Sequence, residues 1–498
     1  MIIGSFSYSH TSLYAAALAL VLTGTGDIAL AQGRGGGRGG GPVGPTVSTS
    51  ATFVVAGDTI DVVGTGFQAG QTVSLEAGGQ RLHATPYVVD AAGRFTGRMG
   101  VPAHASTGSY GVTVKAHGAA DSRFEVKISK RIPLSGQERF TASGAKLVRG
   151  LYQAAYSTAA NAVYVTSAVG RPPVHESELL KVDPKTMTIL AKTTPAAAPA
   201  ATGRQGGGPP GGRGAGAAPG RGAPGGGGAP GSTSGPGVYA VYGVAIDDID
   251  RTVWVTNSRQ NTVAVYRQSD LTLIKQFPVG AVPHARDVVV DAKRGRAYAS
   301  ANSENFVAVF DTKTLEQLPN IEIASTKSGQ TFAPASLELD DVSGKLYTVG
   351  LRTSEAAVID IVKGRVEKVI PLNHAEGAIG VAWDGGNKYL LVVSQGSDNL
   401  LIVDPSSGRT VHDVYVGAGA LNVAYDPVHK LAYVSNRVAG TVAVVDPARG
   451  LIVANLDGRS SPNHVTADGK GGVFAVNKSR GAEDPNGDFL TYIAPTTH

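Results

Sequence analysis

The sequence predicts an all-β protein, with a seven-bladed β-propeller preceded by a small β-sandwich. The first observation is the segment LAYVSNRVAGTVAVVD at 431–446, where two runs of alternating β-branched and aromatic residues flank a polar, glycine-containing break. This pattern is typical of two antiparallel strands joined by a hairpin. The second observation is that the segment recurs every 40 to 50 residues or so, roughly the period of propellers with one four-stranded blade per repeat.

Seven copies follow one another, each anchored on the first residue of its motif. The anchors are Tyr164, Trp254, Tyr298, Tyr347, Leu391, Tyr433 and Phe474. In four copies an aspartate closes the second run at the same distance from the anchor, as Asp446 does after Tyr433. The first interval keeps the period once a Gly/Pro-rich insertion at 195–237 is removed, so the spacings predict seven blades.

The chain begins with a predicted signal peptide at 1–31. The apolar run at 13–22 is too short to span a bilayer, and Ala29 and Ala31 form an A-x-A cleavage pattern. The start departs from the usual pattern, since residues 1–12 contain no Lys or Arg. We expect a periplasmic or secreted protein with no transmembrane segment after cleavage. Residues 32–45 are a Gly/Arg-rich linker that cannot build a packed core.

Residues 46–130 predict the sandwich. Strand-like runs such as TIDVV at 59–63 and TVSL at 72–75 alternate with short turns. The run GTGFQAGQTV at 64–73 and the pair AAGRF and GSYGVTV resemble bacterial immunoglobulin-like modules. The resemblance implies an immunoglobulin-like domain that serves as a spacer or docking module.

Residues 131–498 predict the propeller. The last repeat ends after its third strand, and a ring lacking one strand would leave an open sheet edge. The segment RFTA at 139–142 is therefore predicted to pair with 489–494 and to close the ring. The insertion at 195–237 falls between the first and second blades, and its Gly, Pro and Ala content predicts a disordered loop.

Aspartates at the strand ends have a predicted structural role. Those after inner strands are Asp247, Asp291, Asp340, Asp384 and Asp426, and those that close third strands include Asp404 and Asp446. An aspartate at such a place accepts a backbone N–H two residues further along the chain. We therefore interpret these carboxylates as turn-forming and not as catalytic.

The segments YVTS, WVTN and YVSN, at Tyr164, Trp254 and Tyr433, resemble the YVTN-repeat, or YncE-like, family of bacterial β-propellers. The segments at Tyr347 and Leu391 have drifted from that motif. The resemblance implies a secreted or periplasmic seven-bladed propeller, usually without known catalysis. Its motif residues belong to the blades, so it transfers no active site.

Composition disfavours a nucleic-acid partner and excludes thiol chemistry. Net charge is +5, and the arginines of the two low-complexity tracts account for the excess, so the folded parts are close to neutral. Arginines spaced by glycine in the insertion are typical of segments that touch nucleic acids, but no aromatic residues interleave them, which disfavours a nucleic-acid partner. Cysteine is absent, which excludes disulfides and thiol catalysis.

Ligand-binding residues are predicted at the channel mouth, where loops enter the inner strands. The aligned residue before the first apolar position of each inner strand is Gln153, Gly243, Asp287, Ser336, Gly380, Asn422 or His464. Five of these seven are polar, and nearby lie His284, Arg286, His374, Glu376 and Asn463. The predicted ligand-binding set is Gln153, His284, Arg286, Asp287, Ser336, His374, Glu376, Asn422, Asn463 and His464.

Two interpretations of this mouth stay open. It forms a pocket for a small polar or anionic ligand, or for a metal held by His284, His374 and His464 with Asp287 or Glu376. Alternatively, the polar groups satisfy the loop backbone and line a water-filled tunnel, which is favoured because polar residues are expected at a wet mouth. The histidines lack a local spacing motif, so no metal is assigned.

The sequence favours an exported, non-catalytic binding or scaffold protein, with no catalytic residue and no cofactor. Its expected partner is a small polar ligand, a glycan or a protein, bound at the face of a monomeric propeller. The long hairpins at 168–178 and 478–488, together with the Gly-rich insertion, would form a rim on one side of that face, where a protein or glycan could bind. The alternative is a lactonase-like or other hydrolytic enzyme that uses the His/Asp/Glu cluster, since sugar lactonases have a similar fold.

Overall fold

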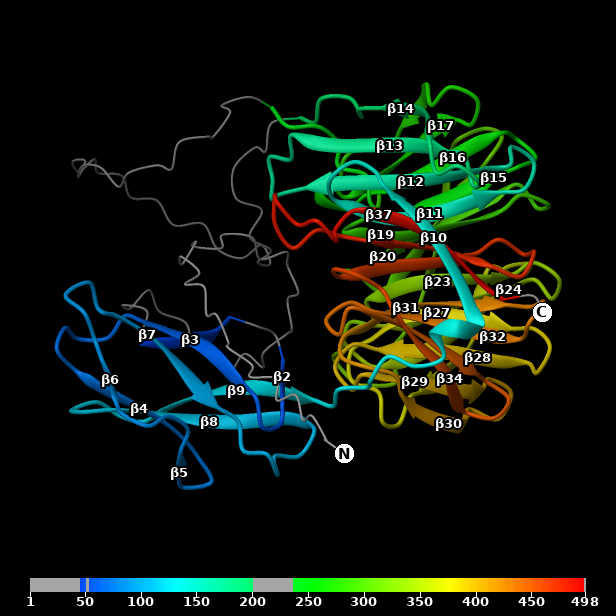
Figure 1. Cartoon of the computed structure of the whole chain (residues 1–498). Coiled ribbons are helices and arrows are strands. Elements are labelled where there is room, and N and C mark those ends of the chain that lie inside the picture. Colours follow the sequence, from blue (N-terminus) through cyan, green and yellow to red (C-terminus); the bar gives the residue numbers. More distant parts are fainter. Residues whose placement is uncertain (1–44, 51–52, 200–235, 497–498) are drawn as a thin grey trace, which may run out of the picture.

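The computed structural model describes residues 45–50, 53–199 and 236–496, which form two all-β bodies (Figure 1). The predicted signal peptide, nearly all of the linker and most of the insertion lie outside these residues. Within them there is no α-helix, and η1 (Gln137–Arg139) and η2 (Ser258–Gln260) are single 3₁₀ turns. No helix in this part of the chain is long and apolar enough to cross a membrane.

The first body packs two sheets around one apolar core, and it lies beside the ring in blue and cyan (Figure 1). One sheet has the order β1 (Thr46–Thr49), β3 (Thr59–Thr65), β7 (Arg94–Gly100). The other has the order β2 (Val54–Val55), β9 (Ser122–Ser129), β8 (Gly108–Ala116), β4 (Thr72–Ala77), β5 (Gln80–Arg81), and β6 (Tyr87–Val88) also pairs with β4. Alternate residues such as Ile60 and Val62 are buried, as expected for strands with one face toward a core.

The second body is a ring of seven four-stranded sheets. Their innermost strands contact one another in chain order, and the last contacts the first. The innermost strands are β11 (Leu151–Ser157), β15 (Val244–Asp247), β19 (Ala285–Asp291), β23 (Pro334–Asp340), β27 (Ala378–Asp384), β31 (Ala420–Asp426) and β35 (Pro462–Ala467). The second strands are β12 (Ala162–Val169), β16 (Thr252–Asn257), β20 (Arg296–Ala301), β24 (Lys345–Gly350), β28 (Tyr389–Ser394), β32 (Leu431–Asn436) and β36 (Val473–Asn477).

The sheets continue outward through two more strands each. The third strands are β13 (Glu176–Val182), β17 (Thr262–Arg267), β21 (Phe306–Asp311), β25 (Glu355–Asp360), β29 (Asn399–Asp404), β33 (Thr441–Asp446) and β37 (Phe489–Pro495). The outer strands are β14 (Ile189–Thr193), β18 (Leu273–Gln276), β22 (Gln317–Glu322), β26 (Arg365–Pro371), β30 (Arg409–Tyr415), β34 (Leu451–Asp457) and β10 (Phe140–Lys146). The second and third strands are the predicted hairpins.

The seventh sheet is assembled from both ends of the ring. Its outer strand is β10, which pairs antiparallel with β37 so that Phe140 faces Pro495 and Lys146 faces Phe489. This is the predicted pairing of 139–142 with 489–494, and it is confirmed. The sheet edge that three C-terminal strands alone would expose is therefore covered.

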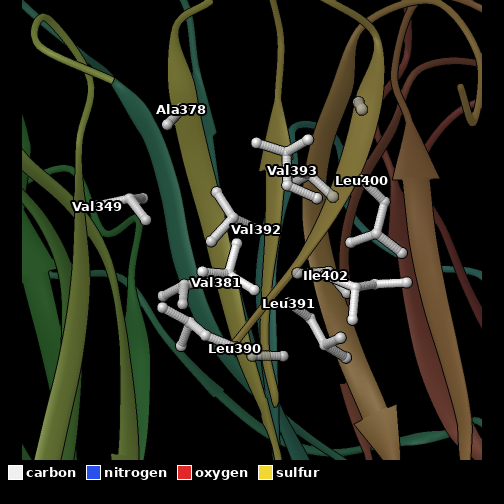
Figure 2. Close-up of a cluster of buried hydrophobic side chains, with 14 of the residues drawn as sticks. Val349, Ala378, Val381, Leu390, Leu391, Val392, Val393, Leu400 and Ile402 are labelled. Atoms are coloured by element: carbon white, nitrogen blue, oxygen red, sulfur yellow. The ribbon is translucent and has the colours of Figure 1, made fainter. Parts of the chain in front are cut away.

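Apolar side chains fill the space between neighbouring sheets. Figure 2 shows one such cluster, in which Val381, Leu391 and Ile402 lie among residues of β27, β28 and β29. Val349 of the preceding sheet belongs to the same cluster. One repeat cannot bury both faces of its sheet, so each sheet depends on its two neighbours for burial.

The strand-end aspartates form turns as predicted. Asp247 accepts the N–H of Ile249 at 2.9 Å, and Asp404 accepts that of Ser406 at 2.9 Å. The same bond, to the residue two positions on, recurs at Asp340, Asp360, Asp384, Asp426 and Asp446. At Asp291 the acceptor bond reaches three residues on instead, to Arg294.

A buried carboxylate joins the two bodies. Asp398, in the loop between β28 and β29, is 2% exposed and forms an ion pair with Lys127 of β9. It also accepts the hydroxyl of Ser129 at 2.6 Å and the N–H of Gly419 at 2.8 Å. A charge removed from water needs several such partners, and Asp398 has them from both bodies.

Closure of the ring can be tested at Gly144 of β10. A Cβ at this position would lie 2.5 Å from the carbonyl oxygen of Leu490 in β37. We expect Gly144→Val to lower the free energy of unfolding by about 1–3 kcal/mol, because the strands must separate to admit the side chain. Chemical denaturation measures this. Ser143→Val, on the adjacent exposed position of the same strand, is the control and should change stability far less; equal stability of the two variants would contradict the role of β10.

Candidate functional site at the mouth of the ring

The inner strands are irregular where they begin. In six of the seven sheets, the pairing of first and second strands shifts register at this point, as between Leu151 and Ala154. Such a bulge re-aims the side chains beside it and is common next to functional sites. It lies at the residues that the sequence alignment placed at the channel mouth.

Hydroxyl groups of the YVTN-like segments hold this irregular backbone. The third residue of the segment accepts the N–H of the mouth residue in three sheets: Gln153 to Thr166 (3.2 Å), Gly243 to Thr256 (2.7 Å) and Asp287 to Ser300 (3.0 Å). The hydroxyl of Thr166 also donates to the carbonyl oxygen of Tyr242 in the next sheet. The motif threonine thus satisfies backbone groups that a bulge leaves without a ladder partner.

A cavity of about 340 Å³ is enclosed by the seven inner strands. Five of the predicted residues line it, namely Gln153, Asp287, Ser336, Asn422 and His464. The other five, His284, Arg286, His374, Glu376 and Asn463, are not part of its lining. The alignment therefore identified the residues on the axis, whereas the surrounding set is distributed over the loops.

Four lining side chains connect neighbouring sheets. Each accepts the N–H of an inner-strand residue in the next sheet: Gln153 from Val244 (3.2 Å), Asp287 from Leu337 (3.0 Å), Asn422 from Val465 (2.8 Å) and His464 from Ala154 (3.5 Å). The backbone-satisfying interpretation is therefore supported for these four residues. The His464 bond uses Nδ1 as acceptor, which leaves the ring proton on Nε2.

Electrostatics in the cavity follow from burial. Burial, with a contribution from the nearby Arg286, lowers the pKa of His464 to about 3, so its imidazole is neutral. Burial raises the pKa of Asp287, while the N–H of Leu337 and the charge of Arg286 oppose this shift. Burial thus disfavours the charged form of both residues.

Glu338 is a cavity residue that the alignment missed. It lies two positions after Ser336, where the other inner strands carry Ala155, Ala245, Val289, Ala382, Ala424 and Thr466. Burial raises the pKa of Glu338 to about 8, and repulsion from Asp287 and Asp340 adds to the shift, against the N–H bond from Trp383. Aligning the inner strands at this position as well would have identified Glu338, because it is the one carboxyl among small or apolar side chains there.

The loops around the cavity opening carry cations. Five come from five different sheets: Arg259 in η2, Arg286 in β19, Arg352 between β24 and β25, Arg437 between β32 and β33, and Lys478 between β36 and β37. Burial and then Arg437 lower the pKa of Lys478 to about 8. Burial, with a contribution from Arg286, lowers the pKa of Arg437 as well. The predicted set contained only Arg286.

The two central arginines are Arg286 and Arg437, and Arg286 lies close enough to the buried Asp287 for its charge to act on that carboxyl. The Nε of Arg286 is buried without a hydrogen bond, and in the described part of the chain neither Arg286 nor Arg437 forms an ion pair. Lys478 instead donates to the carbonyl oxygen of Ala168 at 3.0 Å and lies 5.0 Å from the ring of Tyr152. The bond to Ala168 also joins the two long hairpins where they begin.

The histidines and acids of the metal interpretation are not brought together. His374 and Glu376 are exposed, in the loop that leads into β27. His284, the residue that precedes β19, is also exposed. Among the residues that the structure describes, no three His, Cys, Asp or Glu side chains are close enough to hold a metal ion.

No family model and no curated protein matches this chain. Solved structures do match it. The WD40 repeats of RRP9 align with a TM-score of 0.52 at 9% identity, over 73% of this chain and 99% of that one. The β-propeller domain of Cps50 (Swd1) from Myceliophteria thermophila aligns with a TM-score of 0.50 at 10% identity, over 72% and 100%. The ring is a β-propeller.

A third similar structure is streptogramin B lyase, with a TM-score of 0.51 at 10% identity, over 73% of this chain and 100% of that one. Sequence identities of this size show the fold alone. Functions attach to sites and not to folds, so the propeller takes neither a partner nor a reaction from these structures.

Asn422 tests the connection between sheets. Asn422→Leu keeps the volume but leaves the N–H of Val465 without its acceptor, and we expect it to lower the free energy of unfolding by about 1–3 kcal/mol. Chemical denaturation is the measurement. Ser336→Ala is the matched control in the same lining position, since the Ser336 hydroxyl makes no hydrogen bond within the described residues. If both variants unfold at the same denaturant concentration as the wild type, the connection is not stabilising.

Glu338 predicts a pH dependence of stability. Its folded pKa of about 8 exceeds the ordinary value of 4.5, so between these pH values the folded state binds a proton that the unfolded state has released. Stability contributed by this group is present below pH 4.5 and is lost as pH rises to about 8. Glu338→Gln should therefore be more stable than the wild type at pH 8 and equally stable near pH 4.5, measured by thermal unfolding. Glu322→Gln, exposed on β22, should follow the wild type at every pH.

Proposed function

We propose that this protein is an exported, non-catalytic binding protein whose propeller mouth binds a small anionic ligand. In this proposal the body is a seven-bladed propeller of the YVTN-repeat type, built from 131–498. An immunoglobulin-like domain at 46–130 acts as a spacer or docking module. Support for the fold assignments comes from the seven sheets, the YVTN-like segments and the two-sheet N-terminal body.

We infer an anionic ligand from one observation: the guanidinium groups of Arg286 and Arg437 form no ion pair within the described residues. A cation that is partly removed from water without a counter-charge is destabilising, as the lowered pKa of Arg437 also indicates. An anion that bridges such groups regains charge-assisted hydrogen bonds, which are about twice as strong as neutral ones. The two guanidinium groups therefore favour the binding of an anion at the mouth.

The hydrolytic alternative has weaker support. It needs several histidines and acids around one point, yet His374 and Glu376 lie in an exposed loop outside the cavity lining. His464, with its Nδ1 facing the N–H of Ala154, has little freedom to act as a base. We therefore retain binding as the proposed function.

The proposal is tested by titrating the purified protein with inorganic phosphate in a calorimeter. We expect binding by the wild type and a loss of about tenfold or more in affinity for the double variant Arg286→Gln/Arg437→Gln, since each removes a charge-assisted contact. Arg365→Gln, exposed on the outer strand β26, is the charge-matched control and should bind as the wild type does. Equal phosphate affinity in the double variant, or failure of the wild type to bind phosphate or any of the polyanions tested below, would refute the proposal.

A further inference from the structure

The five mouth cations exceed what a single negative charge requires. Arg259, Arg286, Arg352, Arg437 and Lys478 all lie on the face where loops enter the inner strands. Asp488 is near Lys478, but its carboxylate already accepts the N–H groups of Gly150 and Ser479 at 2.8 and 3.1 Å. Arg286, Arg352 and Arg437 form no ion pair within the described residues, so their charges are available to a ligand.

The cations surround the axis instead of lying on one side of it. They belong to the second, third, fourth, sixth and seventh sheets, so their donors approach the centre from several directions. A carboxylate offers two oxygens in one plane, whereas a phosphate presents oxygens in three dimensions and carries up to two charges. A surrounding set of donors fits the second geometry better.

Acidic side chains line the cavity beneath this opening. Asp287 and Glu338 both line it, and Glu338 is half-buried there. Neither of these acidic side chains attracts an anion that enters the cavity along the axis. The charged part of a ligand is therefore stabilised at the opening, between the cationic loops, and not deeper in the cavity.

Two tyrosines, Tyr152 and Tyr242, support Lys478 at the opening. The ring of Tyr152 packs edge-on against Tyr242 with 4.7 Å between ring centroids, and Nζ of Lys478 lies above Tyr152. Asn463 donates to the carbonyl oxygen of Tyr152 at 2.6 Å, which fixes this segment to the seventh sheet. Lys478 is consequently held at the rim and directed by neighbours that are themselves held in place.

From this geometry we propose that the ligand is a compact polyphosphate, in which two or more linked phosphate groups contact arginines from opposite sides of the mouth. The inference rests on the proposed anion-binding function and adds the ligand class to it. Linked phosphates bring several charges to one small site, and each added phosphate engages cations of a further sheet. Burial and then repulsion from Arg437 lower the pKa of Lys478, and such a ligand relieves the repulsion between these two cations.

The test compares inorganic phosphate, pyrophosphate and triphosphate by calorimetry at constant ionic strength, with citrate as a polycarboxylate of comparable charge. We expect affinity to rise about tenfold or more from phosphate to triphosphate, and citrate to bind more weakly than pyrophosphate. Triphosphate that binds no tighter than phosphate, or citrate that equals pyrophosphate, would overturn the inference while leaving anion binding intact. No binding of any probe would instead overturn the proposed function.

A single variant distinguishes a site for one phosphate group from a site for several linked phosphate groups. Arg352→Gln removes an exposed cation of the fourth sheet that is not part of the pair Arg286 and Arg437. It should reduce triphosphate affinity by about three- to tenfold with little effect on phosphate. Arg365→Gln is again the control. Equal losses for phosphate and triphosphate would contradict a ligand that spans the mouth. A short single-stranded oligonucleotide completes the series: if it binds more tightly than triphosphate, the mouth recognises a nucleic-acid backbone and the compact ligand is excluded.

Discussion

Pairing of β10 with β37 is the constraint on which the rest of the structure depends. Sheets of a propeller bury their faces only against their neighbours, so an unclosed ring would expose the first and last sheets. Closure makes β35 and β11 neighbours, and only then does Asn463 reach the carbonyl oxygen of Tyr152. Lys478 and Ala168 also meet across this junction. The mouth therefore exists as a consequence of where the chain begins and ends its ring.

Several polar residues at the mouth have a structural role, because their side chains bind the backbone of the neighbouring sheet. Gln153 and Asn422 use their side-chain carbonyls to hold the next sheet, and the glycines leave room where that backbone comes closest. A Cβ on Gly380, for example, would lie 2.9 Å from the carbonyl oxygen of Leu421. With these roles accounted for, Arg286 and Arg437 stand out as side chains that make no hydrogen bond or ion pair within the described residues. This contrast separates the supporting residues from those available for recognition.

The sequence was informative where information is local. A hairpin with its turn aspartate is encoded within one repeat, so the period, the strands and the role of Asp404 could be predicted. Counting strands also predicted closure by 139–142. The cationic set could not be predicted, since Arg437 and Lys478 follow motif segments in loops whose proximity arises only in the closed ring. Glu338 was missed because one position per strand was aligned, and a bulge depends on pairing that no single strand reveals.

The interface at Asp398 bears on how the molecule withstands mechanical load. In the register of β10 with β37, Phe140 at the start of one strand faces Pro495 at the end of the other, so tension on both ends would peel the bonds apart one at a time. Asp398 and Lys127 tie the preceding body to the loop between β28 and β29, far from that sheet edge in the chain. A pull on the N-terminal side is therefore borne first by this ion pair. The pairing of β10 with β37 then carries this load only after the contact at Asp398 has broken.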